Sequence, residues 1–569
     1  MPQDAFTLKY LCKELNEIFS GGKINRITQP NNDELVLTIY TGKCTEKLLL
    51  NVNPSSPRIG VIKEEKESPL TAPNFCMLMR KHLLSATVDG VELIGFDRIV
   101  KIDFTASKEF FDAEKKTLYV ELMGRYSNII LTENGKILGG NRGINMFDNG
   151  VRPLIVGYPY VFPPVGDKKL PTDKSLVEYF QAFEGGSLAE YICKGVQGIA
   201  QSTATEIVNS FLDGGEEIGG DYFGERFSKF LVGFLFKAKI NPCVTIKDGV
   251  IKDVSVFPYG AVDGDRIFFD TLHQAEQYYF TERERVKRYV TKKERLTSIV
   301  NTALKKARKR LTAINAKEKD ALSAEENRIK GELILSNIYK IKQGEKSVEL
   351  LNYYDGTTLT IALDEYLSPS KNAESYYKKY NKQKRTLKAL EPQKNQAQTE
   401  LNYLLSVLDE IQLAEDISEL KLVGTELEQQ GILRAQSEPK RRKIIEAFCN
   451  EYVVDGFVVR VGRNNLENDK VTFTAKPHDI WLHAKDYHSS HVIIETLGKP
   501  VSEQVIKICA EICGYYSKGR DGGKIEIAYT EKKNVKRPSG AKPGFCTYDN
   551  YKTMVITPEK HVEKIKSII

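Results

Sequence analysis

The sequence lacks the short motifs that mark the commonest nucleotide-dependent and hydrolytic enzymes. It contains no P-loop GxxxxGK[ST], no GxSxG nucleophile elbow and no HExxH zinc motif. The run Gly139-Gly140-Asn141-Arg142-Gly143 is rich in glycine but does not match GxGxxG. We therefore expect no independent catalytic centre and no cofactor, and predict that the protein is not an enzyme.

Paired cysteines and long apolar runs are also missing. The nine cysteines are scattered without a CxxC pair, and their number is odd, which suits a reducing compartment. The longest strongly apolar run is residues 230–236, far short of the ~20 residues of a membrane-spanning helix. The N-terminus carries Asp4 early and no continuous apolar stretch, so we expect no signal peptide. These features predict a cytoplasmic protein with no membrane partner.

Net charge is small, but its distribution is uneven. The 83 Lys and Arg against 76 Asp and Glu leave only +7, whereas residues 282–310 alone hold twelve cations against three acids. Such one-sided charge favours an RNA partner, although a solvated helical face is the usual alternative. The candidate RNA-binding residues on this arm are Lys305, Lys306, Arg308, Lys309 and Arg310.

The length of 569 residues corresponds to about three to five folding units. Residues 1–174 predict an N-terminal lobe: a helix over 4–20, then β-rich runs to 152, interrupted by a helix over 73–85. Asn134-Gly135 predicts a type I′ hairpin turn.

Residues 175–280 are predicted to be mostly helical. Within them, Lys194-Gly195-Val196-Gln197-Gly198-Ile199 joins two helix-like segments. This turn resembles a helix-hairpin-helix motif, whose backbone N–H groups face a nucleic-acid phosphate. A simple connection between two helices is the alternative.

Residues 281–436 predict two long helical arms, over 281–343 and 371–435, that form an antiparallel coiled-coil hairpin. A small tip lies near 345–368, where Asp355-Gly356 predicts a hairpin turn. We expect a bend at Gly331 in the first arm, because glycine weakens a helix interior.

After Lys440-Arg441-Arg442-Lys443, residues 444–569 predict an α+β domain with a mostly antiparallel sheet. Its expected strands include 455–462 and 470–476, and its helix covers 502–517.

Four of the seven histidines lie between 478 and 491, around Trp481, the single tryptophan. A metal site with Cys509 and Cys513 is disfavoured, because these cysteines lie one helical turn apart in an apolar stretch. The functional hypothesis is RNA contact, with Trp481 and His483 stacking on bases and Lys485 meeting phosphate; the alternative makes Trp481 a core anchor. A second basic strip, or a plain solvent loop, contains Lys532, Lys533, Lys536 and Arg537.

Several segments, in this order along the whole chain, resemble the NFACT family. They are residues 53–56, 73–83, Asp97-Arg98-Ile99, 124–131, 367–369, 455–457, Arg463-Asn464-Asn465, 479–486, 490–494 and 542–544. The resemblance implies a multidomain α+β fold: a glycosylase-like N-terminal domain with a helix-hairpin-helix region, a long antiparallel coiled-coil hairpin, and a C-terminal α+β RNA-binding domain.

The resemblance also implies a function in ribosome-associated quality control. The protein would bind the large ribosomal subunit (rRNA and stalk base) carrying stalled peptidyl-tRNA, recruit alanyl-tRNA and support untemplated alanine tailing of the nascent chain. A small RNA-binding protein such as RqcP would be a further partner. Asp97 and Arg98 match the family's tRNA-recognising pair, with Arg80, Lys81 and Arg125 in adjoining motifs; Arg463, Asn464 and Asn465 would contact RNA from the C-terminal domain.

Two departures from the family pattern bear on the alternatives. His488-Ser489-Ser490-His491 stands where the family usually has Pro-Gly-Ser-His, so we expect the turn before His491 to differ from that of the family. Related glycosylases attack with an N-terminal proline followed by glutamate, whereas here Gln3 follows Pro2. A DNA glycosylase-like repair protein is therefore a weak alternative. A surface fibronectin-binding adhesin is the other, although no export or wall-anchor motif supports it.

Overall fold

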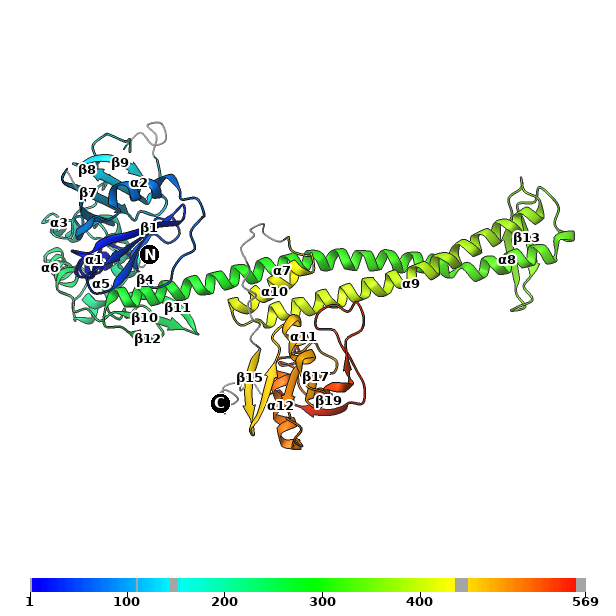
Figure 1. Ribbon diagram of the computed structural model, residues 1–569. Helices are drawn as coiled ribbons and strands as arrows, with labels where there is room; N and C mark the ends of the chain where they lie inside the picture. Colours follow the sequence, from blue (N-terminus) through cyan, green and yellow to red (C-terminus); the bar gives the residue numbers. More distant parts are fainter. Residues whose placement is uncertain (1–2, 109–110, 144–151, 153, 435–448, 559–569) are drawn as a thin grey trace. The chain divides into compact units, whose positions relative to one another are not determined.

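The computed structural model describes residues 3–108, 111–143, 152, 154–434 and 449–558. The chain divides into two compact units, residues 1–285 and 286–569, which we describe separately. Figure 1 shows the elements of both. No helix of the described residues is both long enough and apolar enough to cross a membrane.

The N-terminal unit is built around an antiparallel nine-stranded sheet. In spatial order its strands are β4 (Arg58–Ile62), β3 (Thr45–Asn51), β2 (Glu34–Tyr40), β1 (Lys23–Asn31), β5 (Thr87–Leu93), β6 (Ile99–Lys108), β7 (Phe111–Glu121), β8 (Asn128–Glu133) and β9 (Lys136–Gly140). The predicted turn is confirmed, because Asn134 and Gly135 have φ of 49° and 76° between the paired residues Glu133 and Lys136. A short 3-10 helix, Gly124–Tyr126, connects β7 to β8.

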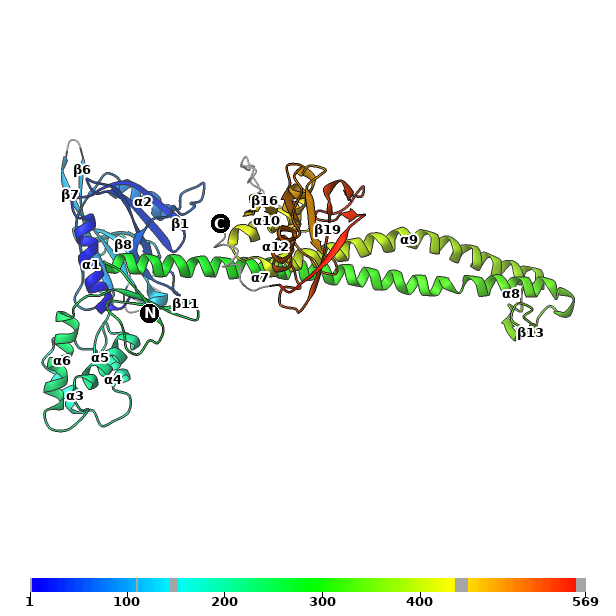
Figure 2. The ribbon, with the colours of Figure 1, turned by 90° about the horizontal axis from the view of Figure 1, so that it is seen from below.

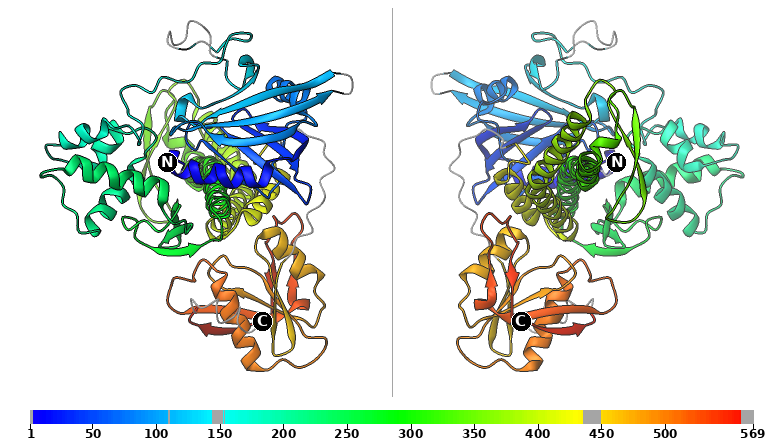
Figure 3. Two further views of the ribbon diagram at one scale, coloured as in Figure 1. Left: turned by 90° about the vertical axis from the view of Figure 1, so that its left-hand side faces the viewer. Right: turned by 90° about the vertical axis from the view of Figure 1, so that its right-hand side faces the viewer.

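Helix α1 (Ala5–Phe19) lies against this sheet, as Figure 3 shows, and buries Phe6, Leu11 and Leu15. Its N-cap is Asp4, which accepts a hydrogen bond from the backbone N–H of Thr7 at 2.9 Å. Helix α2 (Asn74–Leu83) covers part of β1. Both helices confirm the sequence prediction.

The prediction for 175–280 is only partly right. Helices α3 (Leu176–Gln181), α4 (Leu188–Gly195), α5 (Gln201–Asp213) and α6 (Phe223–Lys237) form a cluster beside the sheet (Figure 2). Residues 243–268 instead form the strands β10 (Cys243–Lys247), β11 (Val250–Ser255) and β12 (Asp265–Phe268). The missed signal is Asp248-Gly249, whose φ values of 53° and 70° make the β10–β11 hairpin turn.

In the second unit, two long helices run antiparallel (Figure 1): α7 (Leu272–Leu322), from residue 286 on, and α9 (Pro369–Leu413). Arg310 pairs with Glu400, and Glu318 pairs with Lys394, so one helix ascends as the other descends. Between them lie α8 (Ala324–Ser336), a 3-10 turn (Ile338–Lys340) and the hairpin β13 (Ser347–Leu351) with β14 (Thr358–Ala362).

Two details of these arms correct the prediction. The first arm breaks at Ser323 rather than at Gly331, which stays helical in α8 and allows close packing: a Cβ there would lie 3.1 Å from the ring of Tyr377. The second arm ends at Leu413, and a separate helix, α10 (Ile417–Gln429), begins after its N-cap Asp416.

The C-terminal part of this unit has a six-stranded antiparallel sheet, as predicted. Its strands, in spatial order, are β15 (Asn450–Val454), β16 (Phe457–Val461), β18 (Val492–Glu495), β17 (Ile480–Ala484), β19 (Ile525–Glu531) and β22 (Lys552–Ile556). Helix α12 (Glu503–Tyr515) packs on it, and β20 (Val535–Lys536) pairs with β21 (Thr547–Tyr548) after a 3-10 turn (Lys532–Asn534). The predicted boundary at 444 and Lys440–Lys443 lie outside the described residues.

The strand expected over 470–476 is wrong, because residues 470–474 belong to helix α11 (Asn465–Thr474) and Ala475 is its C-cap. The side chain of Asn464 caps this helix by accepting from the N–H of Glu467 at 3.0 Å. Glu467 in turn accepts from the N–H of Arg463 at 3.0 Å. This reciprocal capping outweighs the strand preference of Val471, Thr472 and Phe473.

Candidate nucleic-acid interfaces

Asp97 and Arg98 lie in a cleft of about 340 Å³ in the N-terminal unit. Three separate parts of the chain form its walls: the 97–98 loop before β6, the connector at Pro164, Val165 and Lys168, and the turn over 197–200. Asp4 and Met123 complete the lining. A cleft of this size falls in the range that takes a small ligand.

Both carboxylate oxygens of Asp97 are fixed. Oδ1 accepts from the backbone N–H of Arg98 at 2.7 Å, and Oδ2 accepts from Nε2 of Gln197 at 3.1 Å. Asp97 and Arg98 are each half-buried, so the pair is accessible from the cleft. An arginine beside an oriented carboxylate offers donors and an acceptor to a nucleotide.

The turn between α4 and α5 is attached to the start of α1. Gly198 O accepts from the N–H of Ala5 at 2.8 Å, and Asp4 Oδ2 accepts from the N–H of Ala200 at 3.1 Å. Gly198 has a φ of 77°, and a Cβ there would lie 2.2 Å from Phe96 O. Only glycine fits this position, which brings the turn against the loop that carries Asp97.

The other three tRNA candidates do not line this cleft. Arg80, on α2, donates from Nε to Ile27 O at 2.9 Å, which uses part of its guanidinium in the fold. Lys81 is exposed on the same helix. Arg125 is exposed and lies over the ring of Tyr126, 4.7 Å from its centroid. Their roles in tRNA binding stay predictions.

The basic arm of α7 presents its charge outward. Lys305, Lys306, Arg308, Lys309 and Arg310 are all exposed, while Leu304 and Ala307 between them are buried against α9. Arg310 also contacts Glu400, with 3.4 Å between nitrogen and oxygen. The stretch is thus an exposed cationic face on a helix, and its contact with RNA stays a prediction.

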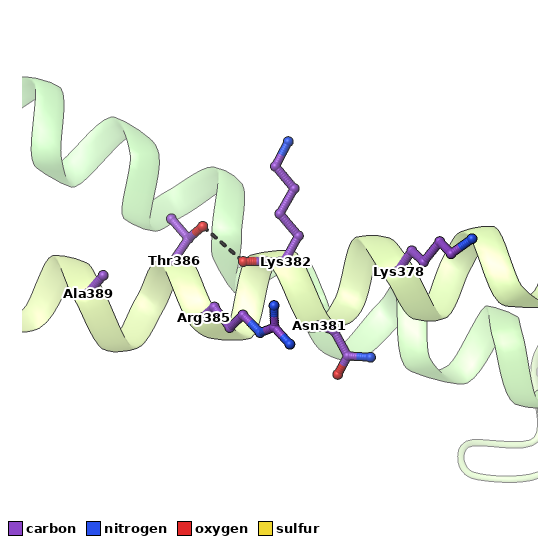
Figure 4. Close-up of a pocket in the computed structure, with 6 residues that line it drawn as sticks. All are labelled: Lys378, Asn381, Lys382, Arg385, Thr386 and Ala389. Carbon is purple, nitrogen blue, oxygen red and sulfur yellow. Dashed lines mark hydrogen bonds between the residues drawn. The ribbon is translucent and has the colours of Figure 1, made fainter.

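The structure shows a further basic surface, on α9, that the sequence analysis did not identify. A shallow groove of about 490 Å³ follows α9 and is lined by Lys378, Asn381, Lys382, Arg385, Thr386 and Ala389. Figure 4 shows Lys382 extending away from the helix, while Lys378 and Arg385 run along it in this view. Residues 378–388 contain six cations and no acid, and that count was available from the sequence.

The structure places Trp481 in the core. Its side chain is 0% exposed and packs with Val471, Ile493 and Val535. Its ring stacks on His483 with centroids 5.6 Å apart and 3° between the planes. This burial agrees with the core-anchor alternative and leaves Trp481 no surface for stacking on RNA bases, so we remove it from the candidate contacts.

Desolvation also lowers the pKa of three histidines around Trp481. Desolvation lowers the pKa of His483 to about 3 and that of His488 to about 4, and it takes the pKa of His491 well below its usual value. Cys509 and Cys513 lie in the hydrophobic core, where burial raises each thiol pKa to about 12. The described residues contain no group of three or more His, Cys, Asp or Glu side chains suited to a metal ion.

The contacts of Arg463, Asn464 and Asn465 are made within the protein. Arg463 pairs with Glu467 at 2.8 Å, and Asn464 caps α11. Asn465 donates from Nδ2 to Glu426 Oε1 at 3.2 Å, so it joins this domain to α10. Asn464 and Asn465 are each 2% exposed, which corrects the expectation that they contact RNA from the surface.

The remaining C-terminal candidates stay at the surface. Lys485, Lys533, Lys536 and Arg537 are exposed, and Lys532 is half-buried. Each exposed one has an acidic neighbour: Glu526 for Lys485, Glu531 for Lys533, Asp549 for Lys536 and Asp469 for Arg537. The strip is therefore less positive than its lysines alone suggest, and its contact with RNA stays a prediction.

Gln3 stands where the related glycosylases have a glutamate, and its side chain is hydrogen-bonded within the fold. Its Nε2 donates to Ile59 O and to Glu276 Oε2, each at 2.7 Å, and its Oε1 accepts from the N–H of Ile59 at 3.0 Å. The side chain is 3% exposed. Pro2 lies outside the described residues.

Two family models cover almost the whole chain. The model of the NFACT N-terminal and middle domains matches residues 4–445, and that of the NFACT protein RNA binding domain matches residues 448–545. The chain belongs to the NFACT family.

Named relatives match over the same extent. A protein of Bacillus subtilis (strain 168) named "Rqc2 homolog RqcH" is 32% identical over 570 residues, with 96% of each chain covered. One of the same name from Streptococcus suis (strain 05ZYH33) is 31% identical over 575 residues, with 100% of each covered. The solved N-terminal part of the fibronectin/fibrinogen-binding protein from Streptococcus suis covers 49% of this chain and 99% of its own, with 25% identity and a TM-score of 0.42. A TM-score this low carries no argument about function.

Proposed function

We propose that this NFACT protein is a cytoplasmic ribosome-associated quality-control factor. It binds stalled large ribosomal subunits with peptidyl-tRNA, recruits alanyl-tRNA and directs untemplated addition of alanine to the C-terminus of the nascent chain. The protein positions tRNA and is not itself an enzyme, since peptide-bond formation belongs to the ribosome. A small RNA-binding protein such as RqcP assists it.

The observation that carries this proposal is the full-length similarity to proteins named as Rqc2 homologues, which includes both domains of the family. The geometry adds support. The half-buried pair Asp97 and Arg98 lines a cleft together with residues 197–200, which belong to the turn whose sequence resembles a helix-hairpin-helix motif. Exposed cations on α7 and α9 offer two further contacts for the phosphates of rRNA, as in a factor that reaches along the subunit.

The test is recovery of RNA with the tagged full-length protein in moderate salt, followed by sequencing. Wild type should recover large-subunit rRNA together with one dominant tRNA species. Asp97→Ala with Arg98→Ala should lose the tRNA and keep the rRNA, because the basic arms contribute no residue to the lining of the cleft. Glu17→Ala with Lys13→Ala, at two exposed residues of helix α1, serves as a matched control. Equal tRNA recovery by both double variants would remove the pair from the proposal, and wild-type protein free of RNA would overturn it.

A further inference from the structure

The cleft at Asp97 has a feature that the motif at 97–98 does not explain. Oδ2 of this carboxylate accepts a hydrogen bond from Gln197, which lies a hundred positions later in the chain, in the turn between α4 and α5. An ionised carboxylate can only accept, so the Nε2 side of the glutamine amide must face it. Gln197 is 8% exposed, and its own backbone N–H donates to Lys169 O at 2.9 Å.

That backbone contact also places a cation in the lining of the cleft. Lys169 forms a parallel bridge with Val196, and its N–H donates to Gly195 O at 2.8 Å. The preceding residue, Lys168, is exposed and lines the same cleft as Asp97 and Arg98. One segment therefore fixes both the glutamine that orients Asp97 and a lysine that lines the same cleft.

We propose that Gln197 is a positioning residue for Asp97, and that Lys168 binds phosphate, in a pocket that takes one unstacked nucleotide of a single-stranded RNA loop. This rests on the proposed tRNA-binding function and specifies what the cleft reads. With each Asp97 oxygen already accepting one bond, the carboxylate presents its remaining lone pairs in a fixed direction.

Such an acceptor selects for a base with an amino donor. Cytosine, adenine and guanine each carry an exocyclic amino group, whereas the single base donor of uracil, N3–H, lies between two carbonyl oxygens that repel a carboxylate. The pocket therefore prefers a nucleotide with an amino group over uridine at that position. Lys168, as a point charge for phosphate, adds affinity without regard to the base.

The experiment measures binding of the full-length protein to short single-stranded oligo(C), oligo(A) and oligo(U). The ratio between sequences isolates the base readout, because the basic arms bind all three phosphate backbones alike. Wild type should prefer oligo(C) or oligo(A) over oligo(U) by roughly ten-fold, the effect of one good base contact. Gln197→Met keeps the length and burial of the side chain but removes its donor, and should bring this ratio close to one.

Two comparisons separate positioning from loss of fold. Gln201→Met, on the exposed first residue of α5, should keep the wild-type ratio. In an Asp97→Asn background, Gln197→Met should have no further effect, since it acts through Asp97. Lys168→Ala should weaken binding to all three sequences equally and lower the salt slope by about 0.7, the value for one phosphate contact on a single strand; exposed Lys174→Ala should change neither.

Each outcome decides between the two proposals. A wild-type ratio near one, or a ratio unchanged in Gln197→Met, overturns the assignment of Gln197 while the recovery of tRNA by the wild type still supports the proposed function. Loss of the ratio in Gln201→Met as well would show a general effect on the turn and also overturn it. A wild type that recovers no tRNA with the large subunit overturns both.

Discussion

The side-chain amide of Asn465 donates to Oε1 of Glu426, 3.2 Å away, and joins the C-terminal domain to helix α10. Tyr403 donates to the same oxygen at 2.8 Å. Glu410 is also buried at this boundary, and no side chain among the described residues is hydrogen-bonded to its carboxylate oxygens, although His488 Nε2 lies 3.9 Å from Oε1. A family motif that was expected to contact RNA thus forms part of an internal, proton-sensitive contact.

This contact should weaken as the pH rises. Burial raises the pKa of Glu426 to about 7 and that of Glu410 well above its usual value, with further repulsion of Glu410 by Glu467 and Asp409. A carboxyl whose pKa is raised in the folded state stabilises that state below its usual pKa of 4.5 and loses the effect as the pH rises through about 7. Hydrogen exchange of α10 should therefore be faster at pH 8 than at pH 6, after correction for intrinsic exchange rates.

Glu426→Gln keeps an acceptor for Asn465 and Tyr403 but cannot ionise. It should remove much of the pH dependence of α10 protection, and exposed Glu391→Gln should leave the dependence as in the wild type. Equal pH dependence in all three proteins would show that Glu426 is not the titrating group.

The C-terminal domain should lose stability in acid. Two half-buried histidines stay neutral when folded, because desolvation lowers the pKa of His483 to about 3 and that of His488 to about 4. The unfolded chain binds protons on them below their usual pKa of 6.5, so stability falls from pH 6.5 downward, by about 1.4 kcal/mol per pH unit for each histidine. The fluorescence of Trp481, the single tryptophan, reports this transition directly.

His483→Phe keeps a ring against Trp481 and removes one titrating group. Its acid transition should move to lower pH, and exposed His478→Asn should leave the transition unchanged. An unchanged midpoint in His483→Phe would mean that other groups drive the acid unfolding.

The groove on α9 should account for part of the salt dependence of ribosome binding. Changing Lys378, Lys382 and Arg385 to alanine should lower the slope of log affinity against log salt by about 2 to 3, if all three cations meet phosphates. Reversing the charges at 305–310 should also weaken binding. The measurement is large-subunit affinity over a series of salt concentrations.

A matched triple variant removes three exposed lysines from the other unit, Lys43, Lys239 and Lys252. It should keep the wild-type slope. The same slope in the α9 variant and in this control would identify the groove as a solvated helical face.

Asn464→Ala should destabilise the C-terminal domain by about 1 kcal/mol, because it removes the N-cap of α11. Asn464→Ser should restore most of the loss, since serine is also a good N-cap. Denaturant unfolding followed by Trp481 fluorescence measures both. A variant with alanine as stable as the wild type would contradict the capping role assigned here.

The sequence predicts an element correctly where neighbouring residues alone determine its structure. The turn at Asn134-Gly135 and helix α1 after Asp4 follow from a few adjacent residues. Helix α11 is not predicted from the local pattern, because the β-branched residues Val471 and Thr472 favour a strand. The cap formed by Asn464 and Glu467 favours a helix instead.

The candidate site was predictable only in part, because its members are far apart in the chain. Asp97 and Arg98 came from the family resemblance, but the contact with Gln197 depends on how the turn packs at Gly198. Burial was the other missing quantity: nothing in the local pattern distinguishes a Trp481 that stacks on RNA from one that is 0% exposed. Packing between distant segments determines both the contact of Asp97 with Gln197 and the burial of Trp481.

The most direct test of the central claim is the mass of a stalled nascent chain. Large subunits carrying a defined peptidyl-tRNA are incubated with the purified protein and total charged tRNA, and the released peptide is measured by mass spectrometry. We predict a ladder of added alanine residues that appears with the wild type and disappears with Asp97→Ala and Arg98→Ala. A peptide of unchanged mass under conditions where the protein is bound to the subunit would contradict the account.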